Sequence, residues 1–285
     1  MPITRRTLLQ GGLAALIATT GCGPMMERTL RLFVEKPGFL ITDHLIVREG
    51  YTHAVTYTSR KKGESELVEL ANDSKIEESW LFFETEEEQG TWIDVGSYQT
   101  PYVSRHIPEF LTKEIKYMQS VRKRRHKPMT ITPYHIHTLY SVCNQKNKYG
   151  LGQYLKQLFG KENELPQVML EISTMPSDGD IINYAVLEDS FKGMLTHSKM
   201  HLRSPKVGAP TGVFEYNFTD KFKRSYLHGN NYSGVENLFI AAVQEGFQKQ
   251  DLNASLEVLR SAGIDITFNR VKTFDKPLLL TESFK

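Results

Sequence analysis

Two histidines separated by a single residue offer the clearest chemistry in the sequence. His135 and His137 flank Ile136 at the end of an apolar stretch, 129–137, that is expected to form a β-strand. Side chains at positions i and i+2 of a strand point to the same face, and their Cα atoms lie about 6.6 Å apart. Two imidazoles at that spacing can bind one metal ion, and zinc commonly takes histidine nitrogen. The pair alone is a weak signal, because two histidines on a strand can also be plain surface residues.

A second polar group lies further along the chain, where an apolar periodicity typical of a helix begins. Ser177 and Asp180 have the Ser-x-x-Asp spacing of a capping box, with Ser177 as N-cap and Asp180 in the first turn. A carboxylate in that turn projects from the helix end and can also serve as a third metal ligand. Three protein ligands leave the fourth zinc position open to water, which is the arrangement of catalytic sites.

The combination resembles the JAMM (MPN-domain) zinc metalloproteases. That family presents His-x-His on a strand after a long helix, and then Ser-x-x-Asp at the start of the next helix. It adds a glutamate roughly 45–60 residues before the histidines, and Glu78 lies at that distance, with Glu77 and Glu84 as alternatives. The resemblance covers about 63–218. The chain departs from the family at Thr138, where proline is usual, and in a longer stretch before Ser177, which predicts an insertion over about 139–173.

The resemblance implies metal-assisted hydrolysis of a peptide or isopeptide bond in a peptide or protein substrate. Zn²⁺ held by His135, His137 and Asp180 would activate a water molecule. Glu78, or Glu77, would act as general base, and Ser177 would donate a hydrogen bond to the developing oxyanion. Two other interpretations stay open: a catalytically inactive MPN-like binding scaffold, and an unrelated envelope lipoprotein with a chance His-x-His pattern.

The elements that must position these residues follow from periodicity and turn residues. Strands are expected at 30–34, 40–47, 53–58, 80–83, 91–95, 129–137, 168–172, 198–206, 212–218 and 264–268. Helices are expected at 63–78, 108–125, 154–159, 178–194, 235–248 and 253–262. Strands and helices interleave without a strict βαβ rhythm, which predicts one α/β domain, 22–285, with helices packed on a mixed sheet. The resemblance implies cytidine-deaminase-like layering of the 63–218 core, extended by an N-terminal β-hairpin and by C-terminal helices.

The first 21 residues have the character of an export leader. Arg5 and Arg6 precede a short apolar run, as in twin-arginine signals, and that run is too short for a transmembrane helix. The segment 19–22 resembles a lipobox, which predicts lipidation of Cys22. We therefore expect an exported protein of the cell envelope, held at a membrane by its lipid anchor.

Charge argues against a nucleic-acid-binding protein. The chain has 35 basic and 33 acidic residues, a formal net charge of +2, and the two leader arginines account for that excess. A neutral body lacks the basic surplus that nucleic-acid binding requires. The oligomeric state cannot be derived from these patterns.

Overall fold

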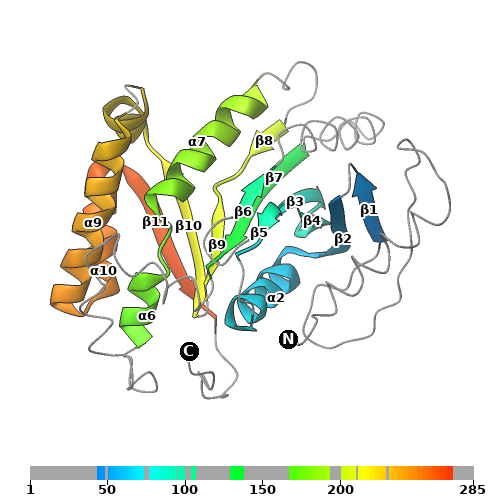
Figure 1. Cartoon of the computed structure of the whole chain (residues 1–285), viewed down its shortest axis with the longest axis horizontal. Helices are drawn as coiled ribbons and strands as arrows, with labels where there is room; N and C mark the ends of the chain where they lie inside the picture. The colour runs from blue at the N-terminus through cyan, green and yellow to red at the C-terminus, as the bar shows by residue number, and fades with distance from the viewer. Residues whose placement is uncertain are drawn as a thin grey trace.

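The structure, a computed structural model, describes ten stretches of the chain (Figure 1). These are residues 44–48, 51–73, 77–94, 96–99, 104–106, 129–137, 167–192, 200–209, 211–228 and 231–271. The strands are β1 (His44–Arg48), β2 (Tyr51–Ser59), β3 (Ser79–Glu86), β4 (Gln89–Asp94), β5 (Gly96–Gln99), β6 (Ser104–His106), β7 (Met129–Ile136), β8 (Met200–Leu202), β9 (Lys206–Ala209), β10 (Gly212–Phe218) and β11 (Ile264–Arg270). The helices are α2 (Arg60–Asp73), α6 (Gln167–Ser173), α7 (Asp178–Lys192), α8 (Asp220–Phe222), the π-helix η2 (Lys223–Leu227), α9 (Tyr232–Lys249) and α10 (Leu252–Ala262).

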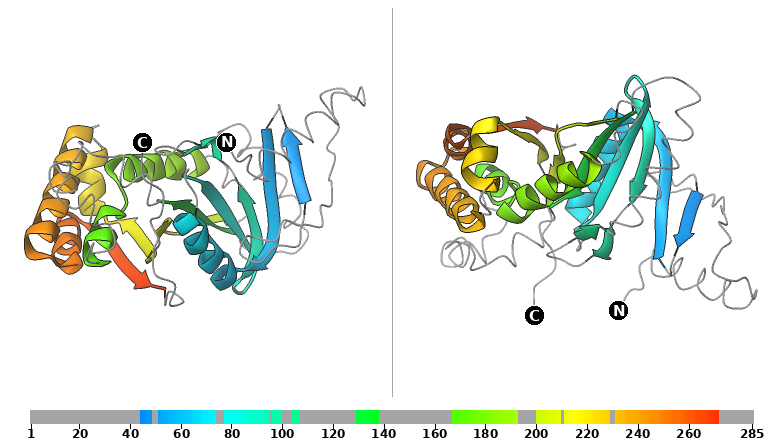
Figure 2. Two further views of the ribbon diagram at one scale, coloured as in Figure 1. Left: turned by 60° about the horizontal axis from the view of Figure 1, so that its bottom comes forward. Right: turned by 90° about the horizontal axis from the view of Figure 1, so that it is seen from above.

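Within the described residues, nine strands form one mixed sheet in the order β1-β2-β4-β3-β7-β9-β10-β11, with β8 also paired to β7. Strand β7 runs parallel to β8 and β9, and the other pairs are antiparallel. Figures 1 and 2 show β1 and β2 at one end of the sheet and α9 and α10 at the other. The α/β class and the mixed sheet expected from the sequence are therefore confirmed.

Strand β7 lies in the middle of the sheet and changes partner along its length. Its first residues, Met129–Ile131, pair with β8, and its last residues, 134–136, pair with β9. Pro133 lies between the two pairings. Its missing N–H group therefore costs the sheet no hydrogen bond. The histidine pair thus lies at the end of a strand that is hydrogen-bonded on both sides, with His135 inside the strand and His137 directly after it.

One face of the sheet packs against α2. The hydroxyl of Ser59 caps this helix by accepting a hydrogen bond from the Lys62 N–H at 3.2 Å. The apolar side of α2 lies on a buried cluster of large side chains from β3, β4 and β7. The cluster consists of Leu67, Ala71, Trp80, Phe82, Trp92, Tyr134 and Ile136.

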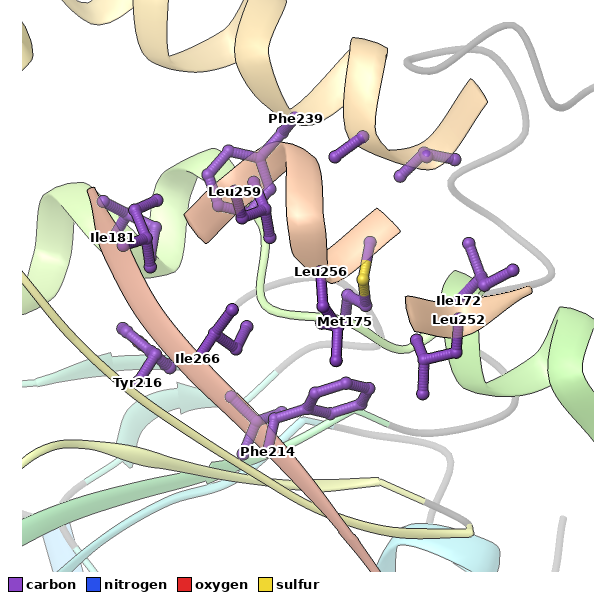
Figure 3. Close-up of a cluster of buried hydrophobic side chains, with 14 of the residues drawn as sticks. Ile172, Met175, Ile181, Phe214, Tyr216, Phe239, Leu252, Leu256, Leu259 and Ile266 are labelled. Atoms are coloured by element: carbon purple, nitrogen blue, oxygen red, sulfur yellow. The ribbon is translucent and has the colours of Figure 1, made fainter. Parts of the chain in front are cut away.

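The opposite face, towards β9, β10 and β11, carries a second core formed with α6, α7, α9 and α10 (Figure 3). Phe214 and Tyr216 of β10 contribute from the sheet, and Ile181 contributes from α7. Alternation of side chains along β10 explains why these aromatic residues share one face. This core fixes the start of α7 against the sheet.

Three expectations from the sequence need correction. Residues 168–172 were expected as a strand, but they belong to helix α6. A short apolar run does not distinguish a strand from a buried helix segment, and tertiary packing against α9 and α10 decides between them here.

The expected strand 198–206 is two strands, β8 and β9, separated at 203–205, where Pro205 cannot donate to a ladder. The expected helix 63–78 begins at Arg60, and Glu77 and Glu78 lie outside it in the segment that enters β3.

Several other expectations fall outside the described residues. They are the leader 1–21, Cys22, the strand 30–34, the helices 108–125 and 154–159, and most of the insertion 139–173. None of the helices in the described ranges has both the length and the apolar composition that a bilayer-spanning helix requires.

Candidate metal centre

The two histidines come from the carboxyl end of β7. The backbone there is held on both sides, because the Ile136 N–H donates to the Glu78 carbonyl at 3.0 Å and the His137 N–H donates to the Gly208 carbonyl at 2.9 Å. The imidazoles of His135 and His137 lie on the same face, with their Nε2 atoms 3.2 Å apart. The expectation from i, i+2 spacing is therefore realised in the geometry of the pair.

The third expected ligand comes from the start of α7. Ser177 and Asp180 form a reciprocal capping box: the Ser177 N–H donates to Asp180 Oδ2 at 2.7 Å, and the Asp180 N–H donates to Ser177 Oγ at 3.3 Å. The Asp180 carboxylate reaches both imidazoles, with Oδ1 3.3 Å from His135 Nε2 and Oδ2 3.1 Å from His137 Nε2. The Asp180 side chain is thus both part of the capping box and a potential metal ligand.

The three side chains together match the donor set of a zinc site. Ligands placed 2.0–2.1 Å from a tetrahedral zinc ion lie about 3.3 Å from one another. The two Nε2 atoms are 3.2 Å apart, and each lies 3.1–3.3 Å from a different oxygen of the Asp180 carboxylate. With one ligand atom taken from each residue, the three atoms lie within 4.8 Å of one another. The side chains of His135 and Asp180 are 16% and 17% exposed, which leaves one side of the group open to a further ligand. The arrangement therefore fits three protein ligands and one exchangeable position.

Two histidines and one carboxylate also hold Fe²⁺ in non-haem oxygenases, on one face of an octahedron. The expected donor separations in that geometry are about 3.0 Å for ligand bonds near 2.1 Å. The separations of 3.1–3.3 Å seen here fall between the two values and involve both oxygens of Asp180, so the arrangement fits either ion. Metal analysis decides between zinc and iron.

A hydrogen bond to the protein backbone sets the tautomer of His137. Its Nδ1 lies 3.0 Å from the carbonyl oxygen of Thr174. A carbonyl can only accept, so Nδ1 must carry the hydrogen, and the neutral ring presents a lone pair at Nε2. Histidine ligands in metalloproteins are oriented by such a bond from the other ring nitrogen. Thr174 lies just after the expected strand 168–172 and the expected insertion 139–173, and no motif marked it.

The three side chains of the candidate site also form a charged group. Burial lowers the pKa of His137, but the Asp180 carboxylate outweighs this effect, with a smaller contribution from Glu77, and raises the pKa to about 9. Burial would raise the pKa of Asp180, and the two imidazoles instead hold it well below its usual range. Without a metal, the group is therefore an imidazolium–carboxylate pair at neutral pH.

The two candidate glutamates lie on opposite faces of the sheet. Ser79 pairs with His135, and the hydrogen bond between Glu78 and Ile136 continues that register by one position. Alternation therefore places Glu77 on the face of the histidines and Glu78 on the α2 face. The Glu78 carboxylate accepts a hydrogen bond from the Trp80 indole at 3.3 Å, whereas the charge of Glu77 is felt at His137. Both side chains are buried.

Comparisons with protein-family models, with curated proteins and with solved structures found no match to this chain.

Proposed function

We propose that the protein is a zinc-dependent hydrolase of the JAMM type that cleaves peptide or isopeptide bonds. The observation that carries the proposal is the convergence of His135, His137 and Asp180: the two Nε2 atoms are 3.2 Å apart, and each lies 3.1–3.3 Å from an oxygen of the Asp180 carboxylate. Support also comes from the order of the elements: α2, β3, β7 and, after the short helix α6, the helix α7 that Ser-x-x-Asp opens. The proposal includes a JAMM-like core at about 63–218, with the N-terminal strands and the C-terminal helices as additions to it.

Zinc, when bound by these three residues, supplies Lewis acidity to a water molecule and to a carbonyl oxygen. The remaining chemistry belongs to the chain. We assign the general base to Glu77 in place of Glu78, because Glu77 shares the histidine face and Glu78 is engaged by Trp80. Glu77 would take a proton from water at its carboxylate and return it to the leaving amine, so that the proton count balances.

The motif suggests that Ser177 donates a hydrogen bond to the oxyanion, but its contacts here give it first the role of positioning Asp180. Its hydroxyl donates to Asp180 Oδ2 at 2.8 Å, so Ser177 primarily positions the ligand carboxylate. Donation to an oxyanion requires the hydroxyl to turn away from Asp180. Hydroxyl rotation is inexpensive, and the backbone N–H of Ser177 continues to hold Asp180 at 2.7 Å.

The experiment that tests this function is elemental analysis of the purified full chain beside a His135→Ala/His137→Ala double variant. The proposal expects about one zinc per chain, lost in the variant. Iron in place of zinc would favour an oxygenase, and the absence of bound metal after reconstitution would leave a binding scaffold as the better interpretation. If zinc is present, hydrolysis of a peptide library is then compared with a Glu77→Gln variant.

Localisation is a separate part of the proposal. The leader 1–21 would direct export, and lipidated Cys22 would tether the chain in the cell envelope. Expression with a radiolabelled fatty acid tests this directly, with Cys22→Ser as control. Label on the wild type alone supports the anchor, and label on neither protein overturns it.

A further inference from the structure

The backbone acceptor of His137 directly follows the last residue of α6, a helix that supplies none of the expected metal ligands. The Thr174 carbonyl receives the Nδ1–H of His137 at 3.0 Å. A metal ligand is therefore connected to a part of the chain with its own set of tertiary contacts.

The Thr174 carbonyl is held by the side chain of the same residue. Thr174 is fully buried, and its single hydroxyl hydrogen is shared between the carbonyls of Leu170 at 3.0 Å and Glu171 at 3.1 Å. The Thr174 N–H donates to the Leu170 carbonyl as well, at 3.0 Å. These bonds satisfy the last carbonyls of α6 and fix the peptide group that faces His137.

Helix α6 is in turn attached to the last strand of the sheet. The Glu171 carboxylate is fully buried and accepts two hydrogen bonds from Arg270 of β11, at 2.7 and 2.9 Å, and one from Gln167 at 3.1 Å. A bidentate arginine–carboxylate ion pair fixes the orientation of the two side chains as well as the distance between them. Met169 and Ile172 of the same helix pack into the core beside α9 and α10.

We infer that Thr174 and the Glu171–Arg270 ion pair are positioning residues for the metal ligand His137. The inference rests on the proposed function, because it requires His137 to bind zinc. We call Thr174, Glu171 and Arg270 together the brace. Through the Thr174 carbonyl, the brace holds the His137 imidazole in the Nδ1–H tautomer and directs Nε2 toward the metal. The C-terminal strand thereby sets the zinc affinity of a ligand on β7.

The test measures zinc affinity of the full-length chain by competition with a chromophoric chelator. Thr174→Val keeps the shape of the side chain and removes the hydroxyl, and it is expected to weaken zinc binding by about 10–100-fold, as loss of partners around a ligand typically does. Thr174→Ser restores the hydroxyl and should return the affinity to near wild type. Arg270→Lys, at a side chain 63% exposed, should weaken binding in the same direction and by less.

Thr211→Val is the matched control. Thr211 is buried, and its hydroxyl makes no hydrogen bond within the described part of the chain. The same substitution there should leave zinc affinity unchanged. A second readout is the Nδ1–H proton resonance of His137 in the zinc form, which should lose protection from solvent exchange in Thr174→Val.

The outcomes separate the two proposals. A wild type without measurable zinc affinity overturns the metal site and the brace together. A wild type that binds zinc, with Thr174→Val and Arg270→Lys binding equally well, overturns the brace alone, even if both variants unfold at lower temperature. Weaker binding in both variants, rescued in Thr174→Ser, supports it.

Discussion

At the start of α7, Ser177 makes two hydrogen bonds to Asp180, and both go to the same carboxylate oxygen. Asp180 Oδ2 accepts from the backbone and the hydroxyl of Ser177, at 2.7 and 2.8 Å, and the same oxygen lies 3.1 Å from His137 Nε2. The helix cap therefore orients the carboxylate for the imidazoles. Any change at the cap is expected to appear in metal binding as well as in stability.

Ser177→Ala should weaken both properties. Loss of the cap is expected to lower the free energy of unfolding by about 1 kcal/mol. Loss of the hydroxyl contact to Asp180 should reduce zinc affinity by about tenfold or more. Chemical denaturation and chelator competition measure the two effects, and Ser177→Thr, which retains the hydroxyl, is the control. Unchanged zinc affinity in Ser177→Ala would show that Asp180 is oriented without the cap.

Glu77 and Glu78 should behave differently when each is changed to glutamine. Glu77→Gln is expected to reduce hydrolysis by about 10²–10⁴-fold with zinc content retained, because it removes the proposed base and no ligand. Glu78→Gln should leave hydrolysis largely unchanged, since its side chain contacts Trp80 on the other face. Initial rates at saturating zinc provide the measurement. The reverse order of effects would return the base to Glu78.

The metal-free protein should lose stability as the pH rises above neutrality. The pKa of His137 is about 9 in the folded chain and near 6.5 when unfolded, so protonation stabilises the fold. The stabilisation is complete below pH 6.5, declines between 6.5 and 9, and is absent above 9. Its size is on the order of 3 kcal/mol. Urea unfolding across this range measures the free energy of unfolding as a function of pH. Asp180→Asn is the control and should make that free energy nearly independent of pH. A wild type with no such pH dependence would contradict the charged pair.

Zinc binding near pH 7 should release about one proton per ion. His137 is protonated in the metal-free chain at that pH, and a histidine must be a neutral imidazole to bind a metal. Calorimetric titration in buffers with different ionisation enthalpies gives the number of protons released. The number should fall toward zero near pH 10. Binding without proton release at pH 7 would mean that His137 is neutral before the metal arrives.

Two helix glycines should respond in opposite ways to alanine. A Cβ at Gly246 would lie 1.8 Å from Ser255 Oγ and 3.1 Å from both Ser255 Cβ and Ile172 Cδ1, so Gly246→Ala forces Ser255 into another rotamer and crowds the contact of α9 with α10 and α6. We expect a loss of about 1–3 kcal/mol in the free energy of unfolding. At Gly179 the nearest atom would be Ser177 Oγ at 3.5 Å, an ordinary contact. Gly179→Ala should therefore be neutral or stabilising by less than about 1 kcal/mol, and comparable losses at both positions would show that helix packing is not the cause.

Local features of the metal centre could be predicted from the sequence because backbone geometry fixes them. The same-face placement of His135 and His137 follows from the two-residue repeat of a strand. The capping box of Ser177 and Asp180 follows from the three-residue spacing at a helix start. Helices α7, α9 and α10 were likewise marked by periodicity and lie close to their expected ranges.

Features that depend on strand register were decided by the tertiary structure. A shift of one residue between β3 and β7 would exchange the faces of Glu77 and Glu78, and the sequence of β3 holds nothing that fixes this register. The apolar segment 168–172 became helix α6 because α9, α10 and Arg270 bury one side of it and pair its carboxylate. The sequence alone therefore determined which residue types lie at ligand spacing. Only the long-range packing of β3, β7, α6 and α7 determined which of them meet, since contacts between distant segments follow from the whole core and not from local periodicity.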